Sequence, residues 1–149
     1  MSDHAEIAER KARLSTLAKA PHDRLLSLWE SHGVVPEHFV LRAPEIGTVM
    51  VRGRAGAVGA PFNLGEITVT RCSVRVASGA VGHGYVQGRS FEAARTAALI
   101  DAMAQDGQAQ ALDAQILAPL RAEAAEATAK RAARAAATKV EFFTMVRGE

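Results

Sequence analysis

The sequence of 149 residues predicts an α+β fold in which a small antiparallel sheet is flanked by N-terminal and C-terminal helices. Two differences in composition carry this prediction. Glycine, valine and threonine dominate residues 47–88, whereas 20 of the 31 alanines lie between Ala93 and Ala137. Apolar residues that alternate between turn-forming glycines are typical of strands, and alanine has the highest intrinsic helix propensity.

The length is typical of one domain, so we expect a single domain over residues 1–149. It divides into a helical region at residues 1–33, a strand-rich region at 38–89, a second helical region at 90–139 and an apolar tail at 140–149.

Two helices are expected in the first region. Ser2 or Asp3 can cap a helix that runs to about Lys19. Pro21 suits the first turn of a second helix, and Gly33 is placed to end it. The apolar side of that second helix recurs at i, i+3, i+4 and i+7, as Leu25, Leu28, Trp29 and His32.

The strand-rich region is expected to begin with two short strands on either side of Pro44, at residues 39–42 and 46–52. A flexible, glycine-rich connection follows at 53–61, then a long strand at 66–76. Ser78-Gly79 marks a hairpin turn into a further strand at 80–87.

The long strand changes phase at Arg71. Ile67 and Val69 share one face, whereas Cys72, Val74 and Val76 occupy the opposite parity. A one-residue slip moves the apolar set between faces, so the pattern predicts a β-bulge at Arg71.

The last region is expected to hold three helices. Ser90 caps one that runs to about Asp106, and Gly107 closes it. A short helix at 112–117 follows, and Pro119 opens an alanine-rich helix to about Thr138. Alanine buries little area, so this last helix is either solvated or laid against another protein.

Composition and motif searches exclude several functions. The net charge of +2 is too small to argue for nucleic acid, and no apolar run is long enough to span a membrane, so we expect a cytoplasmic protein without a membrane or nucleic-acid partner. Cys72 is the single cysteine, which excludes a disulfide framework within the chain. The five histidines have no metal-ligand spacing, and phosphate-loop, zinc-protease and nucleophile-elbow motifs are absent, so no metal site is expected.

Residues 82–90 are the richest segment in chemistry, because three glycines lead from a strand into a capped helix. Helix N-termini bind anions, Arg89 adds a bidentate donor, and His83 adds a titratable one. One interpretation is a phosphate or phosphonate cradle. The other is a tight exit from the strand, in which Ser90 is only a cap.

Arg71 is the third anion-binding candidate, beside His83 and Arg89. A bulge often redirects a side chain toward a site, so Arg71 could face the same cleft. The alternative is an arginine on the wet face of a sheet.

The tail follows a polar helix and concentrates apolar residues. It could fold into the core of its own domain, or it could dock in a groove of a partner, which the small supply of large apolar residues favours. The partner-interface candidates are Phe142, Phe143, Met145 and Arg147.

Five segments, in the same order and covering most of the chain from Arg42 onward, resemble the PhnG family of the bacterial carbon–phosphorus lyase system. They are GAPFNLGE (residues 59–66), VTRCSVR (69–75), GHGYVQGR (82–89), AALIDAM (97–103) and FFTMVRG (142–148).

The resemblance implies a role in phosphonate catabolism. Proteins of this family act with the PhnH, PhnI and PhnL subunits to displace adenine from ATP by an alkylphosphonate, which gives a ribose 1-phosphonate 5-triphosphate. The core complex also contains PhnJ, the radical iron–sulfur lyase, and PhnI is thought to hold the nucleosidase activity. ATP is thus expected as substrate of the complex, with no cofactor in this chain.

The resemblance assigns no catalytic residue to this subunit, and three hypotheses stay open. The chain is a structural or substrate-shaping subunit of the transferase complex, inactive alone. Alternatively, it contributes His83 to a shared active site as the acid or base for departure of adenine. A third possibility is a pure scaffold without ligand contact.

Overall fold

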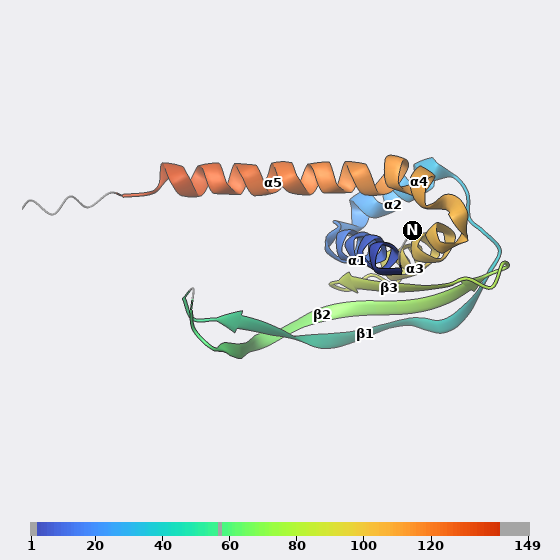
Figure 1. The fold of residues 1–149 in the computed structure, drawn as a ribbon, viewed down its shortest axis with the longest axis horizontal. Helices are drawn as coiled ribbons and strands as arrows, with labels where there is room; N and C mark the ends of the chain where they lie inside the picture. The colour runs from blue at the N-terminus through green and yellow to red at the C-terminus, as the bar shows by residue number, and fades with distance from the viewer. Residues whose placement is uncertain (1–2, 57, 141–149) are drawn as a thin grey trace, which may run out of the picture.

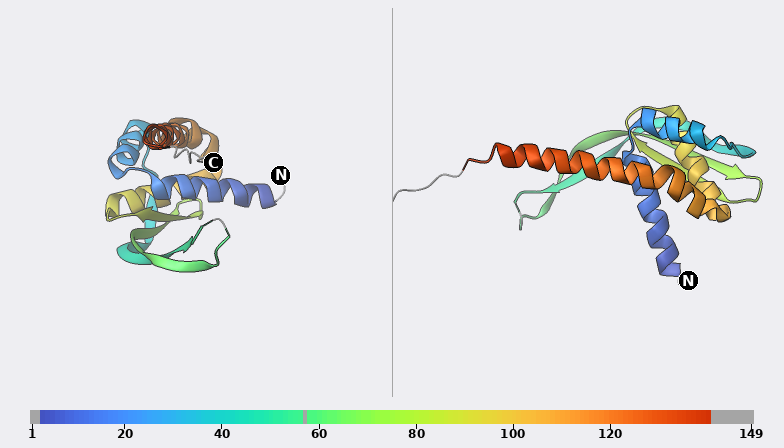
Figure 2. Two further views of the ribbon diagram at one scale, coloured as in Figure 1. Left: turned by 90° about the vertical axis from the view of Figure 1, so that its left-hand side faces the viewer. Right: turned by 90° about the horizontal axis from the view of Figure 1, so that it is seen from above.

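The computed structural model describes residues 3–56 and 58–140. Its three-stranded antiparallel sheet has the order β1-β2-β3 and carries the helices on one face (Figures 1 and 2), which confirms the predicted α+β class. The helices are α1 (Asp3–Lys19), α2 (His22–His32), α3 (Phe91–Met103), α4 (Ala109–Leu112) and α5 (Ala118–Ala137), and the strands are β1 (His38–Arg54), β2 (Pro61–Val76) and β3 (Val81–Gln87).

The two N-terminal helices end where the sequence predicts. α1 runs to Lys19, and α2 ends at Gly33, whose φ of 74° is left-handed and whose N–H donates to the Trp29 carbonyl at 3.2 Å. Leu17 of α1 and Leu25 of α2 are buried in the core. A glycine is favoured at such a helix end because a Cβ is disfavoured at positive φ.

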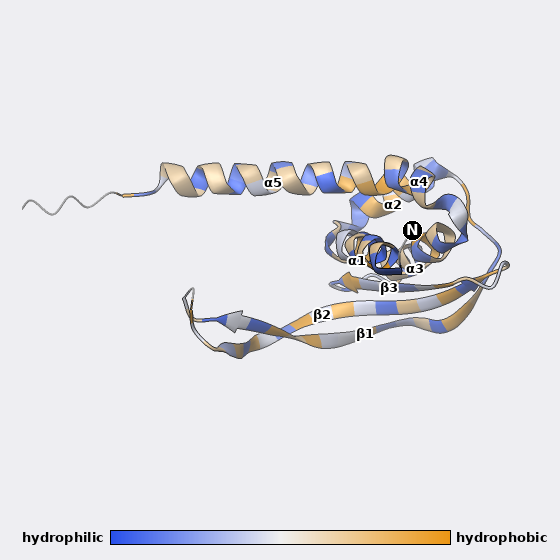
Figure 3. Cartoon of the chain, in the orientation of Figure 1, coloured by the Kyte–Doolittle hydropathy of each residue, from blue (hydrophilic) through white to orange (hydrophobic). Residues whose placement is uncertain are grey.

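The strands are longer than the sequence indicates. The two short strands expected around Pro44 form one strand, β1, and β2 begins at Pro61 instead of residue 66. Both extend beyond β3 and α3 as a two-stranded ribbon, on the same side of the molecule as the projecting α5 (Figure 1). We call this ribbon, residues 48–54 of β1 and 61–68 of β2, the β-ribbon. Hydrophobic and hydrophilic residues alternate along it (Figure 3).

The prediction of a bulge at Arg71 is wrong. The pairing of β2 with β3 is regular from Val69 to Arg75, and the irregularities near Arg71 lie in β1, between Val40 and Glu45. Thr70 explains the misleading pattern, because it takes a core position on the same face as Cys72 and is fully buried. Its hydroxyl donates to the Gly88 carbonyl at 2.7 Å and accepts from the Ser90 N–H at 3.1 Å, so a polar residue replaces the expected apolar one.

Helix α3 packs on the sheet at very short range. A Cβ at Gly82 would lie 1.9 Å from the Ala98 carbonyl oxygen, and a Cβ at Gly84 would lie 1.9 Å from that of Ala94. The Ser90 side chain caps α3 by accepting from the Ala93 N–H at 3.1 Å. The core therefore forms between the alanines of α3 and the sheet, with Val74, Val86, Ile100 and Met103 among its buried residues.

After α3 the chain turns sharply and returns over the helices. Gly107, at φ +86°, makes the kink within segment η1 (Ala104–Gln108). α4 and the short helical segment η2 (Asp113–Leu117) bury Leu112, Ile116 and Leu117. α5 then leaves the body, and within it only Leu120 is buried (Figure 1). The tail candidates Phe142, Phe143, Met145 and Arg147 lie outside the described residues.

Candidate functional site

The face of the sheet opposite α3 brings Arg71 and His83 together. Strand pairing places Arg71 of β2 opposite Tyr85 of β3 and opposite Glu45 of β1, and it places Ser73 opposite His83. Because side chains alternate along a strand, these residues share the face that the buried Cys72 does not occupy.

This open face contains a depression of about 430 Å³, lined by Arg42, Arg71, Cys72, Ser73, His83, Gly84 and Tyr85. The side chain of Arg71 is 42% exposed, and Tyr85 is 44% exposed. The depression is thus accessible to a ligand or to a partner that covers the sheet.

Two arginines share one carboxylate at this depression. Glu45 Oε1 accepts hydrogen bonds from Arg71 Nε at 2.6 Å and from Arg42 Nη1 at 3.1 Å. The hydrogen bond and the charge of Glu45 raise the pKa of Arg71 above its ordinary value, with Tyr85 adding to the effect. One positive charge remains uncompensated in this group, so it favours an anionic ligand.

His83 lies beside this charged group. Its Nδ1 is 2.9 Å from the Ser73 hydroxyl oxygen, and its side chain is exposed on the open face. The hydrogen bond orients the imidazole and leaves Nε2 for a second partner. An imidazole held in this way can accept or donate a proton or bind an anion.

Arg89 is not among the residues that line the depression. It lies exposed in the turn between β3 and α3, after Gly88. The N–H groups around it are engaged within the chain: that of Gly88 donates to the Thr68 carbonyl at 2.8 Å and that of Ser90 to Thr70 at 3.1 Å. The glycines of residues 82–90 serve close helix packing and a tight strand exit, which favours the second interpretation of this segment.

A buried carboxylate that the sequence analysis did not single out lies behind the depression. Asp101 of α3 is 0% exposed, and its Oδ2 accepts from the His83 backbone N–H at 3.1 Å and from Arg10 Nη2 at 2.8 Å. Arg10 Nε donates to Oδ1 at 3.1 Å, and Arg13 Nη2 lies 3.5 Å from the same atom. Burial of a charge is tolerated when it is paired and hydrogen-bonded, so Asp101 fastens α1 to the strand that carries His83. The signal was present, since Asp101 is the charged residue within the apolar segment 97–103.

Within residues 3–56 and 58–140, no group of three or more histidine, cysteine or acidic side chains is arranged to hold a metal ion. Among the helices of the same residues, none is both long and apolar enough to cross a membrane.

The fold defines an α+β protein, and comparison with known proteins assigns it to phosphonate metabolism. The family model described as "Phosphonate metabolism protein PhnG" matches residues 8–148, and the chain belongs to this PhnG family. The chain is also 44% identical, over 99% of its length and 95% of the relative's, to a protein of Rhizobium meliloti (strain 1021) named alpha-D-ribose 1-methylphosphonate 5-triphosphate synthase subunit PhnG.

Proposed function

We propose that this chain is a cytoplasmic subunit of the complex that transfers an alkylphosphonate to the ribose C1 of ATP, and that it shapes the substrate site through its open sheet face. The family membership and the name of the Rhizobium relative support the assignment to the synthase. The partners are the PhnH, PhnI, PhnJ and PhnL subunits, and ATP and the alkylphosphonate reach this chain through the complex.

One observation carries the substrate-shaping role: Arg42, Arg71 and His83 converge on one depression that retains a positive charge. ATP and phosphonates are anions with oxygens in the planar spacing that a guanidinium binds well. In the reaction, a phosphonate oxygen forms a bond to the ribose C1 while the bond to adenine breaks, and the departing adenine takes up a proton. Arg71 stabilises the charge of the phosphate or phosphonate groups during that exchange.

A second candidate role is favoured by the exposed imidazole of His83, which is fixed by Ser73 at 2.9 Å. In this role His83 delivers the proton to adenine as it leaves. A pure scaffold is the remaining alternative, and the pairing of Arg71 with Glu45 is the observation that favours it.

The test uses the assembled complex. Arg71→Ala should slow adenine release by roughly ten- to a hundredfold, since a charge-assisted hydrogen bond is worth about 1.5–3 kcal/mol. Arg71→Lys should restore part of the rate, because an ammonium lacks the planar fork. Arg89→Ala is measured beside it, as an arginine that lies outside the depression.

His83→Ala is measured across pH in the same complex. A lost acid or base changes the shape of the rate profile, whereas a lost anion contact lowers the rate at every pH. Unchanged rates for both Arg71→Ala and His83→Ala in an intact complex would leave the scaffold as the surviving role. The purified chain alone should release no adenine from ATP.

A further inference from the structure

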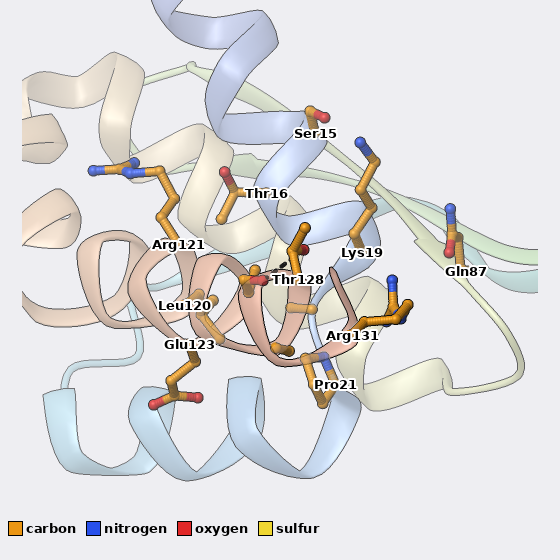
Figure 4. A pocket seen from close by; sticks show the side chains of 13 residues that line it. Ser15, Thr16, Lys19, Pro21, Gln87, Leu120, Arg121, Glu123, Thr128 and Arg131 are labelled. Carbon is orange, nitrogen blue, oxygen red and sulfur yellow. Dashed lines mark hydrogen bonds between the residues drawn. The ribbon is translucent and has the colours of Figure 1, made fainter. Parts of the chain in front are cut away.

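A second surface of the molecule lies on the other side of the helices, between α1 and α5. A groove of about 670 Å³ is lined on one side by Thr16 and Lys19 of α1 and on the other by α5 residues from Leu120 to Arg131 (Figure 4). We call it the α1–α5 groove. Eleven helical steps separate Leu120 from Arg131, so this wall is about 16 Å long.

The floor of the groove is apolar and built from small side chains. Ala20, Pro21, Ala124 and Ala127 lie beside Leu120 in the lining of the groove. Small residues let a further backbone approach closely, and a wall of about 16 Å matches three turns of helix. A helix with apolar residues at i, i+4 and i+7 fits such a groove.

The charged side chains that line the groove indicate the charge of a partner. Glu123 is paired with Arg24 at 2.8 Å, and Arg121 is paired with Asp113 at 2.8 Å. Among the described residues, Lys19 and Arg131 have no ion pair, and Figure 4 shows both on the side of the groove where Gln87 lies, away from Arg121. Two uncompensated cations at one end of an apolar groove attract an acidic group at that place.

We infer that the α1–α5 groove binds an amphipathic helix of another subunit, with an acidic residue directed at Lys19 and Arg131. The inference rests on the proposed function in one respect, namely that the chain works within a multi-subunit complex. It also gives the alanine-rich α5 a role, because the helix supplies the second wall of the groove and a surface that a partner can approach closely.

The experiment measures association of the full chain with the PhnH, PhnI and PhnJ subunits produced together without it. Lys19→Glu combined with Arg131→Glu should raise the dissociation constant at least about tenfold, because attraction for the acidic partner residue becomes repulsion at two positions. The matched control is Lys11→Glu combined with Arg134→Glu. It changes the net charge by the same amount on the same two helices, at residues that do not line the groove. Its dissociation constant should stay within about twofold of that of the unmodified chain.

A steric pair separates docking from general electrostatics. Ala127→Trp fills the groove without a change of charge and should weaken association as well, whereas Ala129→Trp, on an α5 residue outside the lining, should not. Circular dichroism confirms that each variant is folded. Association of the groove variants equal to that of their controls overturns the inference.

Two further outcomes keep this inference distinct from the proposed function. Failure of the unmodified chain to associate with any subunit contradicts the proposed function itself, whatever the groove variants do. A charge-reversal effect that disappears when residues 140–149 are removed identifies the chain's own tail as the occupant, and overturns the assignment to a partner helix.

Discussion

The body of the molecule and its two projecting arms are built on opposite principles. The body consists of α1 to α4, β3 and the parts of β1 and β2 beneath α3; the arms are the β-ribbon and α5 beyond Leu120. The body holds almost all the buried side chains, whereas none of the described residues from 47 to 67 or from 121 to 140 is buried. The body is stabilised by its own packing, whereas the arms leave most of their surface exposed.

The two regions also use small residues differently. In the body, Gly82 and Gly84 bring strand and helix into contact, so that no Cβ fits. In α5, alanines maintain a helix by intrinsic propensity with little burial. Small residues thus allow tight internal packing in the body, where they are glycines, and leave an open surface on α5, where they are alanines.

The largest expected effect comes from the buried network of the body. Asp101→Asn should lower the free energy of unfolding by about 3–5 kcal/mol, because all the polar neighbours of this carboxylate are donors and an amide has one acceptor oxygen. Denaturant titration measures it. Asp106→Asn, on an exposed aspartate five residues later, is the control and should change stability by less than about 0.5 kcal/mol. Equal effects of the two variants would contradict the structural role of Asp101.

A pair of glycine substitutions compares body and arm directly. Gly84→Ala should destabilise the protein by about 1–3 kcal/mol or more, since its Cβ would meet the Ala94 carbonyl oxygen at 1.9 Å. Gly65→Ala on the β-ribbon has nothing within 4 Å of its Cβ and should be near neutral. Thermal unfolding of both variants gives the comparison, and a Gly84→Ala protein as stable as Gly65→Ala would disprove the close packing of α3.

The independence of α5 predicts a local effect. Ala129→Gly should reduce helix stability by about 1 kcal/mol, because glycine loses more backbone entropy than alanine. Hydrogen exchange of the α5 amides should accelerate, while global unfolding by denaturant stays unchanged. A matching loss of global stability would instead show that the projecting part of α5 is coupled to the body.

The smallest expected effect concerns Cys72. Burial raises the pKa of its thiol above the ordinary 9.0, with Arg95 and a hydrogen bond from the Ser73 backbone opposing the shift. Because the folded pKa is raised, the stabilisation is complete below pH 9 and is lost as the pH rises through the folded value. The free energy of unfolding should therefore fall more steeply above pH 9 in the unmodified protein than in Cys72→Ala. An equal dependence of the unfolding free energy on pH in the two proteins would contradict this contribution of Cys72.

Local signals were sufficient to predict α1, α2 and the start of α3. The short helix expected at 112–117 begins earlier in the structure, as α4 at Ala109. Gly33 and Gly107 adopt positive φ where the sequence places helix ends, and Ser90 caps α3 as expected. Each of these signals acts through neighbouring backbone groups, so a single sequence contains the information.

Features that depend on distant partners could not be predicted in the same way. Residues 61–65 look like a loop, with Pro61, Asn63 and Gly65, yet they form a strand because they pair with residues 51–54. The burial of Thr70 could not be predicted for the same reason, since its hydrogen-bond partners at Gly88 and Ser90 are distant in the sequence.

The candidate site shows the same division. The sequence singled out Arg71 and His83, which cross-strand pairing brings to one face, but it could not reveal that Glu45 pairs with Arg71. Asp101 was missed because its partners, Arg10 and Arg13, come from the other end of the chain. The anion-binding role of these residues stays a prediction for the kinetic test.

The outer edge of β1 affects whether the free subunit aggregates. An edge strand of 17 residues exposes a row of unpaired backbone groups, which in many proteins recruits a second edge and starts aggregation. Here Pro44 removes one donor, the register shifts between Val40 and Glu45 twist the edge, and the exposed Arg52 and Arg54 repel an identical copy. These features disfavour strand-to-strand self-association along the β1 edge.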